Sequence, residues 1–432
     1  MYAMKTKPTL QQKLAGRKAD IPPRIIHWMY RIIMSGFVAP KYKPHYVIHD
    51  RVAEGPCFVI WNHLSRLDHA FVMEACWPRR VNIMAGYNEF FRSHLALVFK
   101  LFRIIPKKNY IDDFNNVRAV NTVIKKGGCI AFAPEGMSSI YGQNQPIIAG
   151  TGRFLQYYNV PVYFVHIAGS YLTSTKVCTA ERPGRVEVEL SLMFTPGQLQ
   201  AMSPAEIDAR INEAFRHDDY EWGRQMGLHW KNDGNMCERL SDICYRCPRC
   251  SSELDMTAQG NLIKCNCCGN GATVDDYYEF HPLDGDCVIP EFPTKWVEME
   301  RKAIIDEIRR DPSYSFSFHT KLGCLPEYKL VKSKKVTSVV CGEGDFTIDH
   351  SGLHYRGTKH GEPWQFDLDY KAVFSIPIVT DTSYFSLYVG KEFHDFFPDA
   401  PVVGKLLLLT EEMHRLHENY FKNFPWYDWM YE

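Results

Sequence analysis

Short apolar runs alternate with helix-like segments between about residues 55 and 195, and this alternation limits the possible folds more than any other feature. A run of four to eight apolar residues bounded by polar or glycine-containing segments is typical of a buried strand. The predicted strands are 57–62, 129–133, 161–167 and 185–194, and the predicted helices lie near 68–77, 90–102, 113–125 and 150–158. The pattern predicts an α/β domain with a mostly parallel central sheet.

The 432-residue chain is too long for this one core, and the pattern of apolar and polar residues changes further along the sequence. After about residue 312 it consists of short alternating segments separated by turn residues and ends in a helical stretch. This pattern predicts a small antiparallel β-barrel with a capping helix and resembles the pleckstrin-homology-like fold. We expect five parts, which are a basic amphipathic segment at 1–50, the α/β domain at 51–235, a cysteine-rich ribbon at 236–280, a linker and amphipathic helix at 281–311, and the barrel at 312–432.

Six of the 14 cysteines fall within residues 244–268, where they predict a metal site. Four of them have the spacing C-x2-C-x14-C-x2-C, formed by Cys247, Cys250, Cys265 and Cys268. Four thiolates in this spacing are typical of a tetrahedral structural zinc site with no open coordination position, and the segment resembles a zinc ribbon. Cys244 and Cys267 compete as ligands, and iron is the main alternative metal.

The remaining cysteines are scattered, and the chain start lacks a secretory signal pattern. This predicts reduced thiols in a cytoplasmic protein rather than a disulfide scaffold. Apart from Arg246, Arg249 and Lys264, the ribbon lacks a basic and aromatic stripe, so no nucleic-acid partner is expected.

The charge of the chain is balanced overall but uneven along its length. Lys and Arg together number 50, as do Asp and Glu, whereas residues 1–50 hold nine basic residues against two acidic ones. Residues 24–38 are apolar with Arg24, His27 and Arg31 spaced along them, but they are too few to span a bilayer. They fit either a helix lying in the membrane interface or an N-terminal helix packed on the core. In the first case the protein is peripheral on the inner face of the membrane.

One histidine–aspartate pair stands where a predicted strand gives way to a predicted helix. Four of the 17 histidines are followed by an aspartate five residues later, but only His63, with Asp68, has this setting. Ligands bind at the carboxyl ends of strands in α/β sheets. With Ser65 as the helix N-cap, Asp68 would point back toward His63 and orient it as a general base. The alternative is an exposed loop histidine beside a capping acid.

A second strand ends in a similar polar loop. The predicted strand 129–133 runs into Pro134-Glu135-Gly136, about 70 residues after His63. Glycine lets the backbone approach a ligand closely, and a carboxylate beside it can hydrogen-bond a hydroxyl or orient a neighbour. Two such loops at neighbouring strand ends make a catalytic site more plausible than either alone.

Together these loops resemble the glycerolipid acyltransferases typified by 1-acylglycerol-3-phosphate acyltransferase. The family block N-H-x-x-x-x-D is intact as Asn62, His63 and Asp68, and F-P-E-G-T-R-S is partly kept as residues 133–139. The segments 102–108 (FRIIPKK) and 160–165 (VPVYFV) resemble two further blocks. The resemblance spans about residues 25–220.

The resemblance implies an O-acyltransferase of phospholipid biosynthesis. It implies that His63, oriented by Asp68, takes the proton from the free hydroxyl of a lysophospholipid as that oxygen attacks the thioester of acyl-CoA or acyl-ACP. Asn62, Glu135 and Gly136 would line the acceptor site. The partners would be the lysophospholipid, the acyl donor, with acyl carrier protein as one option, and the membrane surface.

The sequence departs from the family at the residue assigned to the acceptor phosphate. Ser138 stands where the family has Arg, and Met137 where it has Thr. The cations that could together replace the missing guanidinium are Lys107, Lys108 and Arg153, and the alternative is that each of them is a solvated surface charge. The departure leaves the acceptor open between 1-acylglycerol-3-phosphate and a related lipid, and it favours the alternative of a non-catalytic lipid-binding or scaffold protein that keeps the acyltransferase fold.

Overall fold

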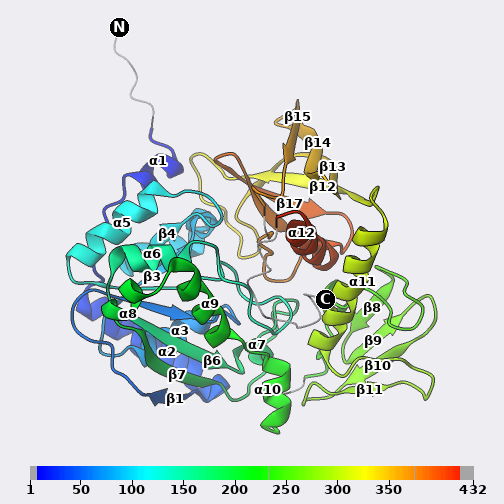
Figure 1. The fold of residues 1–432 in the computed structure, drawn as a ribbon, viewed down its shortest axis with the longest axis horizontal. Helices are drawn as coiled ribbons and strands as arrows, with labels where there is room; N and C mark the ends of the chain where they lie inside the picture. The colour runs from blue at the N-terminus through cyan, green and yellow to red at the C-terminus, as the bar shows by residue number, and fades with distance from the viewer. Residues whose placement is uncertain (1–6, 232, 374, 419–432) are drawn as a thin grey trace.

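The computed structural model describes residues 7–231, 233–373 and 375–418, which form three β-sheets with helices around them (Figure 1). The first sheet has the order β1-β7-β6-β2-β5-β3-β4. Its strands are β1 (His45–Ile48), β2 (Cys57–Trp61), β3 (Val81–Gly86), β4 (Ile105–Lys107), β5 (Cys129–Phe132), β6 (Val162–Ala168) and β7 (Glu187–Phe194). All neighbours pair in parallel except β6 and β7. The predicted α/β domain with a mostly parallel sheet is confirmed.

Helices cover both faces of this sheet because its central strands are apolar on both sides. Val59 of β2 packs in the cluster formed with α2 (Arg24–Tyr42) and α3 (Asp68–Ala75). The adjacent Phe58 and Ile60 point the other way, into the cluster beneath the opposite helices. Those helices are α5 (Phe114–Lys125), α6 (Thr151–Tyr158), α8 (Pro196–Ala201) and α9 (Pro204–Phe215). The shorter helices are α1 (Leu10–Ala15), α4 (Ser93–Leu101), α7 (Ser170–Thr173) and α10 (Asp219–Gln225), with 3-10 turns at Tyr87–Phe91 and Leu240–Asp242.

The second sheet is small and antiparallel, and it carries the cysteine-rich segment. Its order is β11-β10-β9-β8, with β8 (Met256–Gln259), β9 (Leu262–Cys265), β10 (Gly271–Val274) and β11 (Phe280–Pro282). Helix α11 (Pro293–Arg310) follows and packs beside the last helix, α12 (Val403–Glu418). Both lie between the ribbon sheet and the C-terminal sheet (Figure 1).

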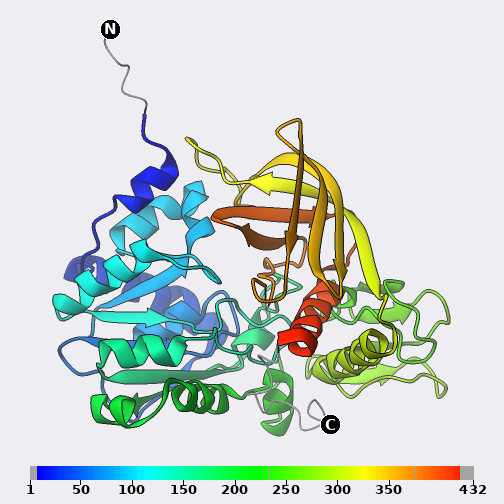
Figure 2. The same ribbon diagram turned by 45° about the horizontal axis from the view of Figure 1, so that its top comes forward.

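The third sheet is a curled antiparallel half-barrel (Figure 2), which is compatible with the small antiparallel β-barrel that the sequence predicts. Its order is β15-β14-β13-β12-β17-β16, with β12 (Ser315–Cys324), β13 (Val339–Asp349), β14 (Gly352–Lys359), β15 (Glu362–Leu368), β16 (Phe385–Val389) and β17 (Glu392–Pro398). In the described part of the chain, the edge strands β15 and β16 do not pair with each other. The described residues 375–379 contribute an isolated antiparallel bridge from Ile378 to Phe385 of β16. Pro377 in this segment cannot donate to a ladder.

A disulfide joins Cys324 and Cys341, which corrects the expectation that the scattered cysteines are all reduced thiols. Strands β12 and β13 pair antiparallel with an irregularity next to Cys324. This pairing brings the two Cα atoms to 6.0 Å, within the range that a disulfide requires. The two cysteines are 17 positions apart in the sequence, and the sequence alone gives no sign of the bridge.

One hydrophobic cluster joins all three parts of the chain. It contains Met137 and Tyr141 from the loop after β5, Ile263 from the ribbon, and Phe346 from the half-barrel. A buried ion network runs through the same region. Arg301 of α11 pairs with Glu411 at 2.8 Å and Glu412 at 2.7 Å, and it also donates to the Tyr141 hydroxyl at 3.1 Å. The loop after β5 is therefore held by elements from the far end of the sequence.

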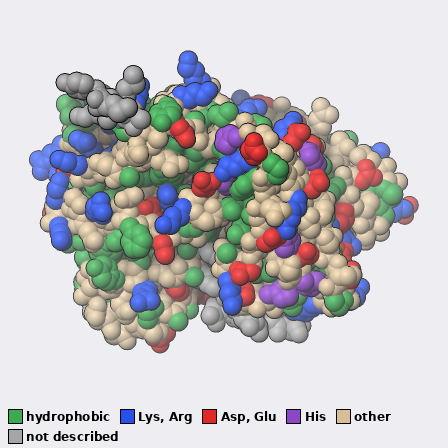
Figure 3. Space-filling model, turned by 90° about the horizontal axis from the view of Figure 1, so that it is seen from above, with side chains coloured by type: hydrophobic (Ala, Val, Ile, Leu, Met, Phe, Trp, Pro, Cys, Tyr) green, Lys and Arg blue, Asp and Glu red, His purple; other side chains and the backbone are tan. Residues whose placement is uncertain are grey.

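Charged side chains are distributed unevenly on the surface. On the face seen in Figure 3, Lys and Arg are scattered over the half that contains α1 and α5, whereas His side chains gather over the half-barrel. The balanced net charge of the chain therefore hides local differences.

Candidate functional site

Three neighbouring strands end in polar loops that meet at one edge of the first sheet. Strands β6, β2 and β5 are adjacent and parallel, so their carboxyl ends lie side by side. His63 follows β2, Glu135 follows β5 and Ser170 follows β6. This is the edge where α/β sheets bind ligands.

The Asp68 carboxylate is completely buried and receives five hydrogen bonds at this edge. One oxygen, Oδ2, lies 2.9 Å from His63 Nδ1 and accepts the backbone N–H groups of Leu64 and Ser65 at 2.7 and 2.9 Å. The other oxygen accepts the hydroxyls of Ser65 at 3.0 Å and Ser170 at 2.8 Å. These donors replace the water that burial removes and fix the carboxylate behind the imidazole.

The turn that brings Asp68 to His63 differs from the predicted capping box. Helix α3 begins at Asp68 itself, and its N-cap is Leu67, which makes no side-chain cap bond. Ser65 instead donates its hydroxyl to Asp68 and accepts the Leu67 N–H at 3.3 Å. A tight turn over residues 65–67, in place of the predicted first helical turn, therefore brings the Asp68 carboxylate to His63.

The geometry leaves one nitrogen of His63 for a substrate. An ionised carboxylate can only accept, so Nδ1 carries the hydrogen and Nε2 keeps its lone pair. No residue of the described part of the chain is hydrogen-bonded to Nε2. The His63 side chain is 26% exposed, while Asp68 is not exposed at all. The imidazole is therefore partly open to solvent, whereas the carboxylate that orients it is shielded from water.

The Glu135 side chain joins the loop after β2 to a later part of the loop after β5 through two hydrogen bonds. Its Oε1 accepts the backbone N–H of His63 and its Oε2 accepts that of Gln145, both at 2.7 Å. Burial raises the pKa of this carboxyl well above its usual range, and the two N–H groups oppose that shift. The sequence places Glu135 in the acceptor site, but both of its oxygens are used to hold the backbone of the site.

Gly136 and Asn62 also hold the backbone in place. Gly136 has φ +83°, and a Cβ there would lie 2.7 Å from Ile148 Cδ1, so this position favours glycine. The amide of Asn62 is fully buried and bonds both the N–H and the C=O of Ile167 at 2.8 Å. Asn62 therefore ties the end of β2 to β6, and its amide is not open to a substrate.

The three cations expected at the acceptor site lie in different settings. Lys107 ends β4, its Nζ is 5.6 Å from the ring centre of Phe132 at the end of β5, and burial lowers its pKa to about 8. The Nζ of Lys108 lies 4.9 Å from the Tyr87 ring centre. Arg153 is exposed on α6. Lys107 is thus the one directed toward the end of β5.

Two residues of the site escape the sequence motifs. Ser170 follows β6 after Gly169, and its place just beyond a predicted strand is a sequence signal that could have identified it. Lys176 carries no such signal, because it lies in a loop of irregular structure. It is 7% exposed, and its Nζ donates to Ser138 Oγ at 2.8 Å. Burial lowers the pKa of Lys176 to about 8. A buried cation from another part of the chain therefore contacts the loop after β5 at Ser138.

The four predicted metal ligands come together in the ribbon. The sulfur atoms of Cys247, Cys250, Cys265 and Cys268 all lie within 4.8 Å of one another. Two pairs, Cys247–Cys268 and Cys250–Cys265, are 3.6 and 3.7 Å apart. Each knuckle closes through a backbone bond to its first cysteine carbonyl, from Ser251 at 2.9 Å and Gly269 at 3.0 Å. Four thiols in this arrangement can hold a metal such as zinc, and Cys244 and Cys267 lie outside the group.

Substitution of one ribbon ligand is expected to remove the metal. We expect Cys250→Ser to lose about one metal ion per chain relative to the wild type, because three thiolates and a hydroxyl no longer complete the tetrahedral set. Cys267→Ser is the matched control, since Cys267 is an exposed cysteine of the second knuckle that lies outside the cluster. Metal content by elemental analysis checks this, and an equal loss in both variants would contradict the ligand assignment.

Comparisons with known proteins leave the family of the chain undetermined. No protein-family profile matches the sequence, and it has no significant match among curated proteins. Among solved structures, the 1-acyl-sn-glycerophosphate (LPA) acyltransferase PlsC from Thermotoga maritima is similar with 17% identity and a TM-score of 0.35. The match covers 44% of this chain and 75% of that one. A likeness of this size does not establish a shared fold.

Proposed function

We propose that this protein is an acyltransferase that moves a fatty acyl group from acyl-CoA or acyl-ACP to the free hydroxyl of a lysophospholipid. The observation that carries the proposal is the contact of 2.9 Å between His63 Nδ1 and the buried Asp68 carboxylate, with Nε2 left for a substrate at a partly exposed position. This is the arrangement that a general-base histidine requires.

In the proposed reaction His63 acts on the acceptor alcohol directly. Its Nε2 takes the proton of the hydroxyl as that oxygen attacks the thioester carbonyl, and Asp68 stabilises the imidazolium that forms. Collapse of the tetrahedral intermediate breaks the carbon–sulfur bond and releases the thiolate of the donor, which takes the proton from His63. The protein forms no covalent bond with the acyl group in this scheme.

We assign the binding of an anionic acceptor headgroup to Lys176. Ser138, its partner, is followed by Ser139, whose N–H donates to the carbonyl oxygen of His63 at 2.7 Å. The ammonium group is thus linked to the base through one short stretch of loop. A buried lysine attracts a phosphate more strongly than an exposed one because less water screens its charge. This placement supports an enzyme that accepts a phosphate-bearing lipid over a non-catalytic scaffold.

We further propose that α2 seats the protein on a membrane surface. Its exposed apolar residues recur every three or four positions along one face and are Ile25, Trp28, Met29, Ile32, Ile33 and Phe37. An apolar helix face in water is typical of a helix that lies in the lipid interface. None of the helices in the described residues has the length and apolar character needed to span a bilayer.

Two finer assignments accompany this proposal. We infer that the ribbon metal is zinc with a structural role, since four thiolates leave no position for a substrate. We also infer a pleckstrin-homology-like relationship for the C-terminal half-barrel, which is supported by its curled antiparallel sheet and the helix α12 that follows it.

Replacement of the base is expected to abolish acyl transfer. We expect His63→Ala to lower the rate by roughly 10²–10⁴-fold, because no other group takes the proton from the acceptor. The measurement is transfer of labelled acyl groups from acyl-CoA to a panel of lysolipids. His281→Ala is the control, because His281 also pairs with a carboxylate, Asp275 at 2.7 Å, but on the exposed ribbon surface. Equal activity of the wild type and His63→Ala on every acceptor would reject the enzyme and leave the scaffold alternative.

Removal of the buried cation is expected to change acceptor preference. We expect Lys176→Met to lower kcat/KM for lysophosphatidate by roughly 10–100-fold, because one charged hydrogen bond is lost, with little effect on kcat/KM for monoacylglycerol.

The same cation predicts a pH dependence of acceptor preference. In the wild type the preference for the phosphate-bearing acceptor should be greatest below pH 8 and should fall above it, because the pKa of Lys176 is lowered to about 8 and its charge is lost as the pH rises. Arg153→Met, which alters an exposed cation, is the comparison. If Arg153→Met changes the preference and Lys176→Met does not, the assignment is wrong.

Charges placed on the apolar face of α2 are expected to release the protein from lipid. We expect Ile33→Asp combined with Phe37→Asp to weaken sedimentation with anionic vesicles by at least roughly tenfold, since each carboxylate must stay hydrated. Phe114→Asp is the control, because Phe114 is 81% exposed on α5, away from α2. Undiminished binding of the double variant would show that α2 does not contact the membrane.

A further inference from the structure

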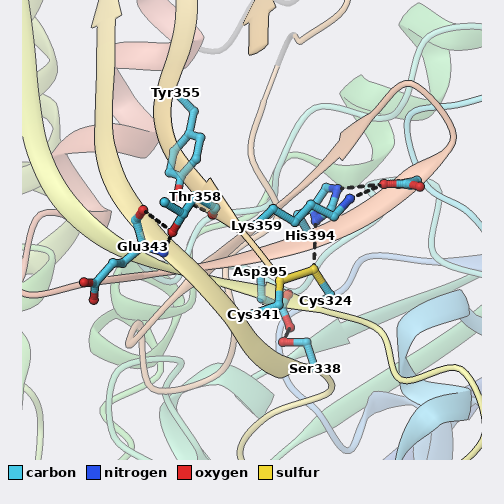
Figure 4. Close-up of a disulfide and its surroundings, with 10 residues drawn as sticks. Cys324, Ser338, Cys341, Glu343, Tyr355, Thr358, Lys359, His394 and Asp395 are labelled. Carbon is cyan, nitrogen blue, oxygen red and sulfur yellow. Dashed lines mark hydrogen bonds and ion pairs between the residues drawn. A yellow bond between two sulfur atoms is a disulfide. The ribbon is translucent and has the colours of Figure 1, made fainter. Parts of the chain in front are cut away.

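Two cysteines and two histidines meet at one end of the half-barrel, far from the ribbon cluster in the sequence. Cys324 ends β12 and lies opposite His394 of β17 in the ladder. Cys341 lies on the neighbouring strand β13, and His360 stands in the turn between β14 and β15. Figure 4 shows Cys324, Cys341 and His394 converging.

The distances between their ligand atoms suit a metal ion. The Sγ atoms of Cys324 and Cys341 and a ring nitrogen of His360 lie within 4.8 Å of one another. The Nδ1 of His394 is 3.8 Å from Cys324 Sγ. In a tetrahedral zinc site the ligand atoms are about 3.5–3.8 Å apart, as zinc–sulfur bonds of about 2.3 Å and zinc–nitrogen bonds of about 2.0 Å require. Cys324, Cys341 and His360 thus lie close enough to share one ion, and His394, next to Cys324, can supply the fourth ligand once the disulfide opens.

The environment of His394 orients its ring for ligation. The side chain is 2% exposed, and its Nε2 lies 3.5 Å from a carboxylate oxygen of Glu392. Metal-bound histidines commonly donate their second ring N–H to a carboxylate, which directs the lone pair of the other nitrogen to the metal. Glu392 also pairs with Lys359 at 2.5 Å, which holds its carboxylate in place.

His360 lies on the side of the proposed site that faces solvent. Its backbone N–H donates to the Cys341 carbonyl at 2.6 Å, which fixes the turn over the cysteine pair. Its side chain is exposed, so an ion can arrive from solvent, and the imidazole can turn onto it without repacking the core. The buried Asp395 nearby is not a competing ligand, because it already accepts hydroxyls from Thr337, Ser338 and Ser386 at 2.9, 2.6 and 2.6 Å.

We propose that these residues form a redox-gated zinc site, with Cys324 and Cys341 joined as a disulfide in the oxidised chain and both ligating Zn²⁺ together with His360 and His394 in the reduced chain. A dithiol reductant supplies the two electrons and two protons that open the disulfide, and it is itself oxidised to a cyclic disulfide. Zinc then displaces the two thiol protons to solvent as the thiolates bind. The site is independent of the proposed acyl transfer.

The two states differ in what they join. The disulfide links only β12 and β13, whereas the metal also ties in β17 and the β14–β15 turn. Reduction in the presence of zinc therefore replaces one cross-link with another that spans more of the half-barrel.

The test counts zinc per chain in the full-length protein before and after reduction. Anaerobic phosphine reduction is followed until the free-thiol count of a denatured sample rises by two, and Zn²⁺ is then added and the excess removed. We expect the reduced protein to hold one zinc per chain more than the oxidised protein, with the ribbon ion as the internal reference. Added Co²⁺ should give the thiolate charge-transfer and tetrahedral absorption bands of a second site.

Variants separate this site from non-specific binding. His394→Gln and the double variant Cys324→Ser, Cys341→Ser should lose the extra ion and keep the ribbon ion, whereas His319→Gln, which alters an exposed half-barrel histidine paired with Asp345, should keep both. The proposal is overturned if reduction adds no zinc, if the disulfide resists reduction in the folded protein, or if the extra ion persists in the double variant.

Discussion

The buried charge of Asp68 is the constraint on which the candidate site depends. A carboxylate without access to water must find donors inside the protein, and here the donors come from its own turn and from the loop after β6. Satisfying the carboxylate therefore fixes the spacing between two strand ends and, with it, the orientation of His63. Loss of this one group would leave five donors without their partner, so its effects would reach well beyond the imidazole.

A second buried carboxyl extends this frame across the sheet edge. Glu135 holds the backbone of His63 and of Gln145 at once, so the loop after β5 cannot shift without moving the base. That loop contacts Arg301 through Tyr141 and shares a hydrophobic cluster with the ribbon and the half-barrel. Helix α11, the ribbon and the half-barrel therefore stabilise the loop that carries Glu135.

Local pattern was enough to predict the elements that surround the site but not the contacts that complete it. The alternation of apolar runs predicted the α/β sheet, and cysteine spacing predicted the four clustered thiols, because both signals lie within short stretches of sequence. Lys176 and the Cys324–Cys341 bridge depend on how distant segments pack, which single-sequence periodicity does not encode. The predicted small barrel is present as a curled half-barrel sheet, whose edge strands β15 and β16 do not pair in the described part of the chain. The motif assigned Asn62 and Glu135 to the acceptor site, whereas the structure shows that their side chains hydrogen-bond backbone groups.

The link between Tyr141 and Arg301 has a consequence for how the protein is made. Chains emerge from the ribosome from their N-terminus, and early segments begin to fold before later ones exist. The strands that carry His63 and Glu135 are complete long before α11 and α12 are translated, yet the loop beside them is anchored by those helices. A nascent chain would thus hold His63 in an unfinished setting until both α11 and α12 have left the exit tunnel.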